Sequence, residues 1–116
     1  MLNSQYRQRK NGGFKTIKET KIVDNQIQVI LAGSIYVEDA RDIKETLTSF
    51  IDEGKTSFLI DLSQVDYIDS TGLGMLVSIH KRAVQKGGSF KLKGLHGLVK
   101  EVFELTRLNK VIEIQK

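Results

Sequence analysis

The chain has 116 residues, of which 40% are hydrophobic and 28% are charged, a composition typical of one soluble globular domain large enough to bury a core. It has no cysteine, which excludes disulfides, thiol catalysis and cysteine-based metal sites, and its two histidines are well separated, which argues against zinc. No stretch is apolar enough for a signal peptide or a membrane span, so we expect a cytoplasmic protein.

The charge is unevenly distributed along the chain. Basic residues outnumber acidic ones by 18 to 14, but four of them (Arg7, Arg9, Lys10 and Lys15) lie in the first fifteen residues, which hold no acid. Without those four, each sign is represented by 14 residues, so the body of the chain is neutral and gives no indication of direct nucleic-acid binding. We therefore predict a polar basic tail over residues 1–15 and a folded domain over residues 16–116.

Hydrophobic patterning predicts eight elements after the tail. Alternating or short apolar runs indicate strands, and longer amphipathic runs indicate helices. In chain order, these are strands 16–23 and 26–31, a helix from about 37 to 52, strand 57–62, a helix that begins near Asp69 and Ser70 and runs to about 86, strand 89–93, a helix from about 96 to 106 and strand 111–114. The order β-β-α-β-α-β-α-β predicts an α/β fold with an opening hairpin and a mixed, largely parallel sheet.

The most informative stretch is the junction at residues 67–77, where a strand is expected to give way to a helix. Asp69 and Ser70 are both good N-cap residues, and the hydroxyl of Thr71 follows. Unpaired N–H groups and the positive end of the helix dipole meet at such a helix start, which favours phosphate chemistry. Gly72 and Gly74 each cost the helix about 1 kcal/mol relative to alanine, so we expect something to approach the backbone closely there.

The faces of this helix leave two interpretations open. Leu76, Val77 and Val84 supply an inward-facing stripe, whereas Met75 and Ile79 fall on a different side. That second side either presents apolar surface to a partner or packs on a neighbouring element.

Catalytic patterns are weak in this chain. His80 is ten residues from Ser70 on the same expected helix, about 15 Å away, and the Gly-x-Ser-x-Gly motif of many hydrolases is absent. The run Gly72-Leu73-Gly74 resembles part of a dinucleotide-binding loop, but Val77 occupies the position of its third glycine. A nucleotide-binding domain remains an alternative, and it predicts thermal stabilisation by added nucleotide.

Three acidic residues could be considered as metal ligands, but we do not favour a metal site. Asp61 lies within an expected strand, Asp66 in an expected turn and Asp69 at the helix start, so turn formation and capping explain the last two without a metal. We expect no metal, no cofactor and no enzymatic activity.

The motifs as a set resemble the STAS domain, and most closely the bacterial anti-sigma factor antagonists. The resemblance is carried by Phe58-Leu59-Ile60-Asp61-Leu62-Ser63 followed by Tyr67-Ile68-Asp69-Ser70-Thr71-Gly72-Leu73-Gly74, and it covers about residues 16–116. In that family the serine after the aspartate is phosphorylated by a kinase that is also the anti-sigma factor. The unphosphorylated antagonist binds this kinase and frees the sigma factor, and a serine phosphatase resets the switch.

By position, this resemblance makes Ser70 the phosphorylated residue. It also implies a partner-binding surface, which we extend to an apolar docking face at Leu73 and Met75; the full expected set is Asp69, Thr71, Gly72, Leu73, Gly74 and Met75. One departure concerns the partner: where family members often carry Gly-Glu-Leu-Asp, this chain has Gly33-Ser34-Ile35-Tyr36, so Tyr36 replaces an acid. The alternative function is a STAS scaffold or regulatory subunit of a membrane transport or signalling assembly. The oligomeric state is left open.

Overall fold

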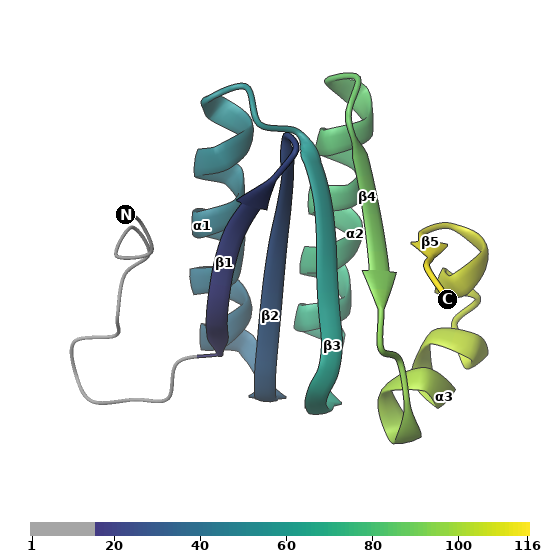
Figure 1. Cartoon of the computed structure of the whole chain (residues 1–116). Coiled ribbons are helices and arrows are strands. Elements are labelled where there is room, and N and C mark those ends of the chain that lie inside the picture. The colour runs from purple at the N-terminus through teal and green to yellow at the C-terminus, as the bar shows by residue number, and fades with distance from the viewer. Residues whose placement is uncertain (1–15) are drawn as a thin grey trace.

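A computed structural model describes residues 16–116, so the predicted tail at residues 1–15 lies outside the described residues. Five strands form one sheet in the order β1-β2-β3-β4-β5 (Figure 1). The elements are β1 (Ile17–Val23), β2 (Gln26–Ile35), α1 (Val37–Asp52), β3 (Ser57–Ile68), α2 (Ser70–Gln85), β4 (Ser89–Lys93), α3 (Gly97–Leu105), the 3-10 helix η2 (Leu108–Lys110) and β5 (Glu113–Ile114).

The predicted mixed sheet with an opening hairpin is confirmed. β1 pairs antiparallel with β2, and β2, β3, β4 and β5 pair in parallel. The hairpin turns at Asp24 and Asn25, whose φ angles of 50° and 69° are those that a two-residue turn between twisted strands requires. The parallel strands are connected through helices, as parallel pairing demands.

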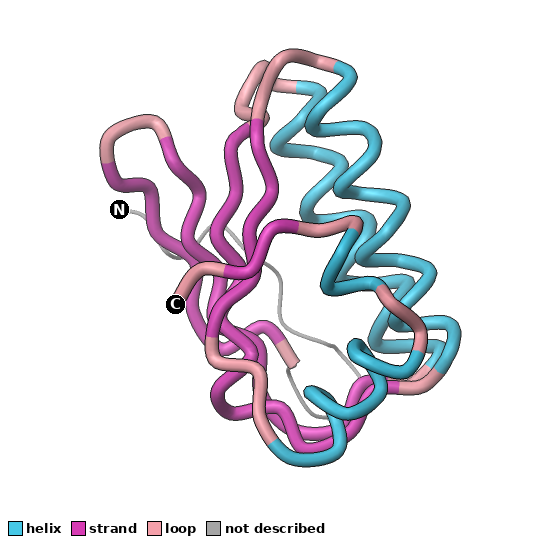
Figure 2. The backbone as a smooth tube through the Cα atoms, turned by 90° about the vertical axis from the view of Figure 1, so that its right-hand side faces the viewer, coloured by secondary structure: helices cyan, strands magenta, loops and turns pink. Residues whose placement is uncertain are grey.

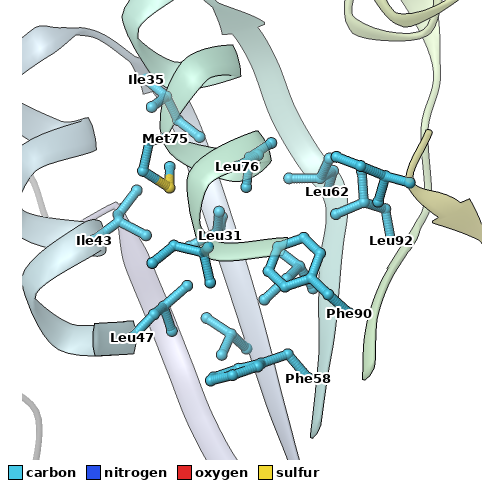
Figure 3. Close-up of a cluster of buried hydrophobic side chains, with 14 of the residues drawn as sticks. Leu31, Ile35, Ile43, Leu47, Phe58, Leu62, Met75, Leu76, Phe90 and Leu92 are labelled. Atoms are coloured by element: carbon cyan, nitrogen blue, oxygen red, sulfur yellow. The ribbon is translucent and has the colours of Figure 1, made fainter. Parts of the chain in front are cut away.

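The core lies between the sheet and the helices α1 and α2, which run along one face of it (Figure 2). Alternate residues of the strands point into this layer because successive side chains of a strand face opposite sides. Figure 3 shows how side chains from both strands and helices meet there, including Leu31, Ile43, Phe58, Leu76 and Phe90.

Two elements differ in length from the prediction in a way that matters for the site. β2 and β3 continue to Ile35 and Ile68, well beyond the predicted ends, because they go on pairing with each other after β4 has ended. The prediction that Asp66 lies in a turn is therefore wrong, since it lies within β3. The last strand was predicted at residues 111–114, but β5 contains only Glu113 and Ile114 and follows the 3-10 helix η2.

The buried face of α2 is also turned relative to the prediction. Val84, expected to point inward, is 50% exposed, whereas Met75 and Ile79 belong to the core. The reason is that α2 contacts both the sheet and the neighbouring α1, so its covered face extends towards α1. Of the two interpretations of the Met75 side, packing on a neighbouring element is confirmed.

Candidate functional site

The candidate site lies where the two central strands end and two helices begin, at the lower end of the sheet in Figure 1. A single residue links each strand to its helix: Tyr36 between β2 and α1, and Asp69 between β3 and α2. The two junctions are held together by a hydrogen bond from the Asp69 N–H to the Ile35 carbonyl (3.2 Å). Parallel strands followed by helices place both helix N-termini at the same edge.

Asp69 caps α2. Its backbone is extended (φ −91°, ψ −179°), its Oδ1 accepts a hydrogen bond from the Gly72 N–H at 2.9 Å, and its carbonyl accepts from the Leu73 N–H at 3.0 Å. A carboxylate at this position is also favoured by the helix dipole. Such a cap stabilises a helix by about 1 kcal/mol, so Asp69 shapes the site by fixing where α2 starts.

Ser70 and Thr71 are the first two residues of α2, and both are exposed. The N–H groups at these two positions have no acceptor within a helix, because no carbonyl lies four residues earlier in helical geometry. A hydroxyl at this point is reachable by a protein partner, and a negative group attached to it would lie at the favourable end of the helix dipole.

Gly72 and Gly74 differ in what an added side chain would contact. A Cβ on Gly72 would lie 2.6 Å from Ile68 Cγ1, 3.0 Å from Ile68 Cδ1 and 3.2 Å from Ile35 Cγ2, so this glycine lets the start of α2 pack on the ends of β2 and β3. A Cβ on Gly74 would meet no atom within 4 Å, and this residue is exposed. The close approach expected from the sequence is internal at Gly72, whereas Gly74 leaves bare backbone on the surface beside Ser70.

This difference predicts opposite outcomes for two alanine substitutions. Gly74→Ala should stabilise the domain by about 0.5–1 kcal/mol through helix propensity alone. Gly72→Ala should be less stable than Gly74→Ala by about 1–3 kcal/mol, because the added methyl overpacks buried Ile68. Urea unfolding of both variants and the wild type measures the difference. Equal stability of the two variants would contradict this assignment of Gly72.

We predicted an exposed apolar docking face at Leu73 and Met75, but the structure does not expose these two side chains in that way. Met75 is 4% exposed and lies among core residues such as Ile35 and Ile43 (Figure 3), so the expectation that it presents apolar surface to a partner is wrong. Leu73 is half-buried and packs against the core. The physical reason is the position of α1, which covers the side of α2 that carries Met75.

Sequence reasoning missed an aromatic pair at this edge. The rings of Tyr36 and Tyr67 lie with their centroids 5.5 Å apart and their planes at 41°, a common arrangement of interacting aromatic rings. They meet because Ser34 pairs with Tyr67 in the parallel register of β2 and β3, so Tyr36 and Tyr67 come from adjacent strand ends. Each tyrosine was visible in the sequence, but their contact required the lengths and register of the two strands.

The start of α1 contains a second capping carboxylate that the sequence analysis did not single out. Asp39 is buried, and its Oδ2 accepts a hydrogen bond from the Tyr36 N–H at 3.0 Å. An acid three residues after the N-cap position is the half of a capping box that binds back to the backbone, and this spacing could have been recognised in the sequence. The Asp39 side chain thereby positions the backbone of Tyr36, whose ring is one of the two exposed rings.

The acids considered for a metal are spread over separate local structures. Asp61 Oδ1 accepts from the Ser63 N–H at 2.8 Å within β3, while Asp69 caps α2. In residues 16–116, no group of three or more His, Asp or Glu side chains is arranged to hold a metal ion. Over the same residues, no helix is both long and apolar enough to cross a membrane.

Comparison with known proteins covers nearly the whole described region. The family model of the STAS domain matches residues 18–116. The anti-sigma-B factor antagonist of Bacillus subtilis (strain 168) is 38% identical over 96 residues, which cover 83% of this chain and 87% of that protein. The corresponding protein of Listeria monocytogenes is 35% identical over 91 residues, covering 78% of this chain and 80% of the relative.

Solved structures agree on the fold. A crystal structure of a Thermotoga maritima protein superposes with a TM-score of 0.79 at 31% identity and covers 84% of each chain. The Bacillus cell fate determinant SpoIIAA, solved in its phosphorylated form, superposes with a TM-score of 0.69 and covers 84% of this chain and 89% of that one. Its identity of 16% means that this second likeness concerns the fold alone.

Proposed function

Because the chain belongs to the STAS-domain family and is related to the anti-sigma-B factor antagonists, we propose that it is an anti-sigma factor antagonist switched by phosphorylation of Ser70. Its unphosphorylated form binds an anti-sigma factor that is also a serine kinase, and this binding releases the sigma factor. Phosphorylation by that kinase ends the complex, and a serine phosphatase restores the binding form. These partners are cytoplasmic, and the chain acts by binding rather than by catalysis.

The observation that carries this proposal is an exposed serine at the first position of α2, in a chain 38% identical to an anti-sigma-B factor antagonist. Ser70 follows the N-cap Asp69, whose carboxylate is engaged with the Gly72 N–H, so the serine is presented at a fixed point of the fold. Around it lie exposed Thr71 and the bare backbone of Gly74. A partner can therefore approach the start of α2 closely.

The electrostatics of this position support a switch. Phosphate adds about −1.5 to −2 charge units at pH 7. The start of α2 tolerates this charge within the free domain, because unpaired N–H groups and the helix dipole favour an anion. A partner that packs on the same surface would have to desolvate the phosphate, and the carboxylate of Asp69, the residue before Ser70, adds like-charge repulsion at this position. One modification can therefore end a complex without unfolding the domain.

The test is mass spectrometry of the protein isolated from its own cells, with and without stress. We expect a phosphorylated form whose phosphate maps to Ser70 and whose occupancy changes with the condition. Phosphate on Thr71 alone would retain the switch but move it to the neighbouring hydroxyl. Absence of phosphate under every condition, on protein clearly detected in the sample, would contradict the proposal and favour a constitutive STAS scaffold.

A further inference from the structure

The surface beside Ser70 contains exposed aromatic rings where the sequence had suggested an aliphatic face. Tyr36 is 53% exposed and Tyr67 is 42% exposed, although their rings contact each other. Val37, next to Tyr36, is exposed as well. With Met75 buried and Leu73 half-buried, these three side chains supply exposed apolar surface at the ends of β2 and β3. We refer to Tyr36, Val37 and Tyr67 as the aromatic surface.

The segments that build this edge are acidic, although the whole chain has a net charge of +4. Residues 33–40 contain Glu38 and Asp39, residues 62–80 contain Asp66 and Asp69, and neither segment contains lysine or arginine. Asp39 and Asp69 are engaged as helix caps, whereas Glu38 and Asp66 are exposed.

Basic side chains border these segments in sequence and in space, and Lys81 directly follows the second segment. Lys18 reaches them from β1, where its Nζ donates to Gln64 Oε1 at 2.8 Å, and Arg41 follows one turn into α1. In sequence, the exposed carboxylates of Glu38 and Asp66 are closer to Tyr36 and Tyr67 than Arg41 and Lys81 are, which favours a positively charged partner.

We propose that the aromatic surface binds an arginine side chain of the protein partner, with the guanidinium over the rings of Tyr36 and Tyr67. This inference rests on the proposed function for the identity of the partner, an anti-sigma factor. A planar guanidinium stacks on aromatic faces and carries the charge that Glu38 and Asp66 attract, whereas an aliphatic side chain would match only the rings. A lysine ammonium would match the charge but stacks less well because it is compact and strongly hydrated.

The tyrosine pair is placed where a contact could make the domain bind one partner more tightly than another. Tyrosine and arginine are both enriched among the residues that dominate protein interfaces. Strand pairing positions the backbone of Tyr67, the hydrogen bond to Asp39 positions that of Tyr36, and the two rings contact each other, which limits the side-chain freedom lost on binding. Tyr67 precedes Ser70 by three residues, so the aromatic surface and the phosphorylated hydroxyl belong to one continuous edge.

The first test uses short peptides and does not depend on the switch. Tetra-arginine and tetra-lysine amides are titrated into the full chain while the aromatic ring signals are followed by NMR. The arginine peptide should shift the signals of Tyr36 and Tyr67 and bind about two- to fivefold more tightly than the lysine peptide. Tyr36→Leu and Tyr67→Leu should each remove most of this preference, whereas the Tyr→Phe variants and Leu105→Ala, an exposed apolar control on α3, should keep it.

The second test measures binding to the anti-sigma factor encoded by the same bacterium. The Tyr36→Leu/Tyr67→Leu variant should bind it at least about fivefold more weakly than the matched Tyr36→Phe/Tyr67→Phe variant. Equal binding of arginine and lysine peptides, or unchanged binding by the leucine variants, would overturn the arginine assignment. If Ser70→Asp still releases the anti-sigma factor in that case, the proposed function stands and only this inference fails.

Discussion

Ser70→Asp is expected to weaken binding to the anti-sigma factor by at least about tenfold, while Ser70→Ala binds as well as the wild type. Aspartate places a permanent negative charge at an exposed position that a partner must cover, and desolvating that charge costs more than 1.4 kcal/mol, the equivalent of tenfold in affinity. Alanine removes only a hydroxyl and cannot be phosphorylated. Titration calorimetry or biolayer interferometry with the purified anti-sigma factor measures both dissociation constants.

The matched control for this prediction is Ser49→Asp. Ser49 is exposed on the last turns of α1, at the opposite end of the sheet from Ser70, so the substitution changes the net charge equally without touching the site. Its affinity should equal that of the wild type. A Ser70→Asp variant that is folded and binds as tightly as Ser49→Asp would remove the electrostatic basis of the proposed switch.

Gly88→Ala is expected to destabilise the domain by about 3 kcal/mol or more, the largest stability effect that we predict for an alanine substitution in this chain. A Cβ on Gly88 would lie 1.9 Å from the carbonyl oxygen of Thr56 and 2.4 Å from its carbonyl carbon, so backbone has to move. The same oxygen accepts a hydrogen bond from the Ser89 N–H at 3.0 Å, which joins the chain just before β3 to the start of β4. Urea or thermal unfolding measures the loss.

The adjacent Gly87 provides the control. Its φ of 86° disfavours any side chain, but a Cβ there would meet nothing within 4 Å, so Gly87→Ala should cost only about 1–2 kcal/mol of backbone strain. Both glycines lie at the end of the sheet opposite Ser70. Folded Gly88→Ala protein should therefore retain its affinity for the partner, and a stability equal to that of Gly87→Ala would show that Thr56 moves at little cost.

Local sequence patterns predicted the helices and strands well where the pattern was long or clearly bounded. The helix at 37–52 and the strand at 89–93 have the predicted bounds, and α2 starts at Ser70 because Asp69 is a good N-cap. Periodicity and capping are properties of neighbouring residues, so they can be read without knowing the rest of the fold. The strand ends were less predictable, because β2 and β3 extend through pairing with each other.

The position of the candidate site and its capping and hydroxyl residues were predictable from the sequence, but which of its side chains are exposed was not. The sequence determined that Asp69 and Ser70 stand between a strand and a helix, with small residues after them, in a pattern resembling one family. Which of the following residues face a partner was decided by the tertiary structure: α1 covers Met75, Ile68 fills the space over Gly72, and strand register brings Tyr36 to Tyr67. Exposure depends on elements far away in the chain, and a local pattern contains no information about which of them pack together.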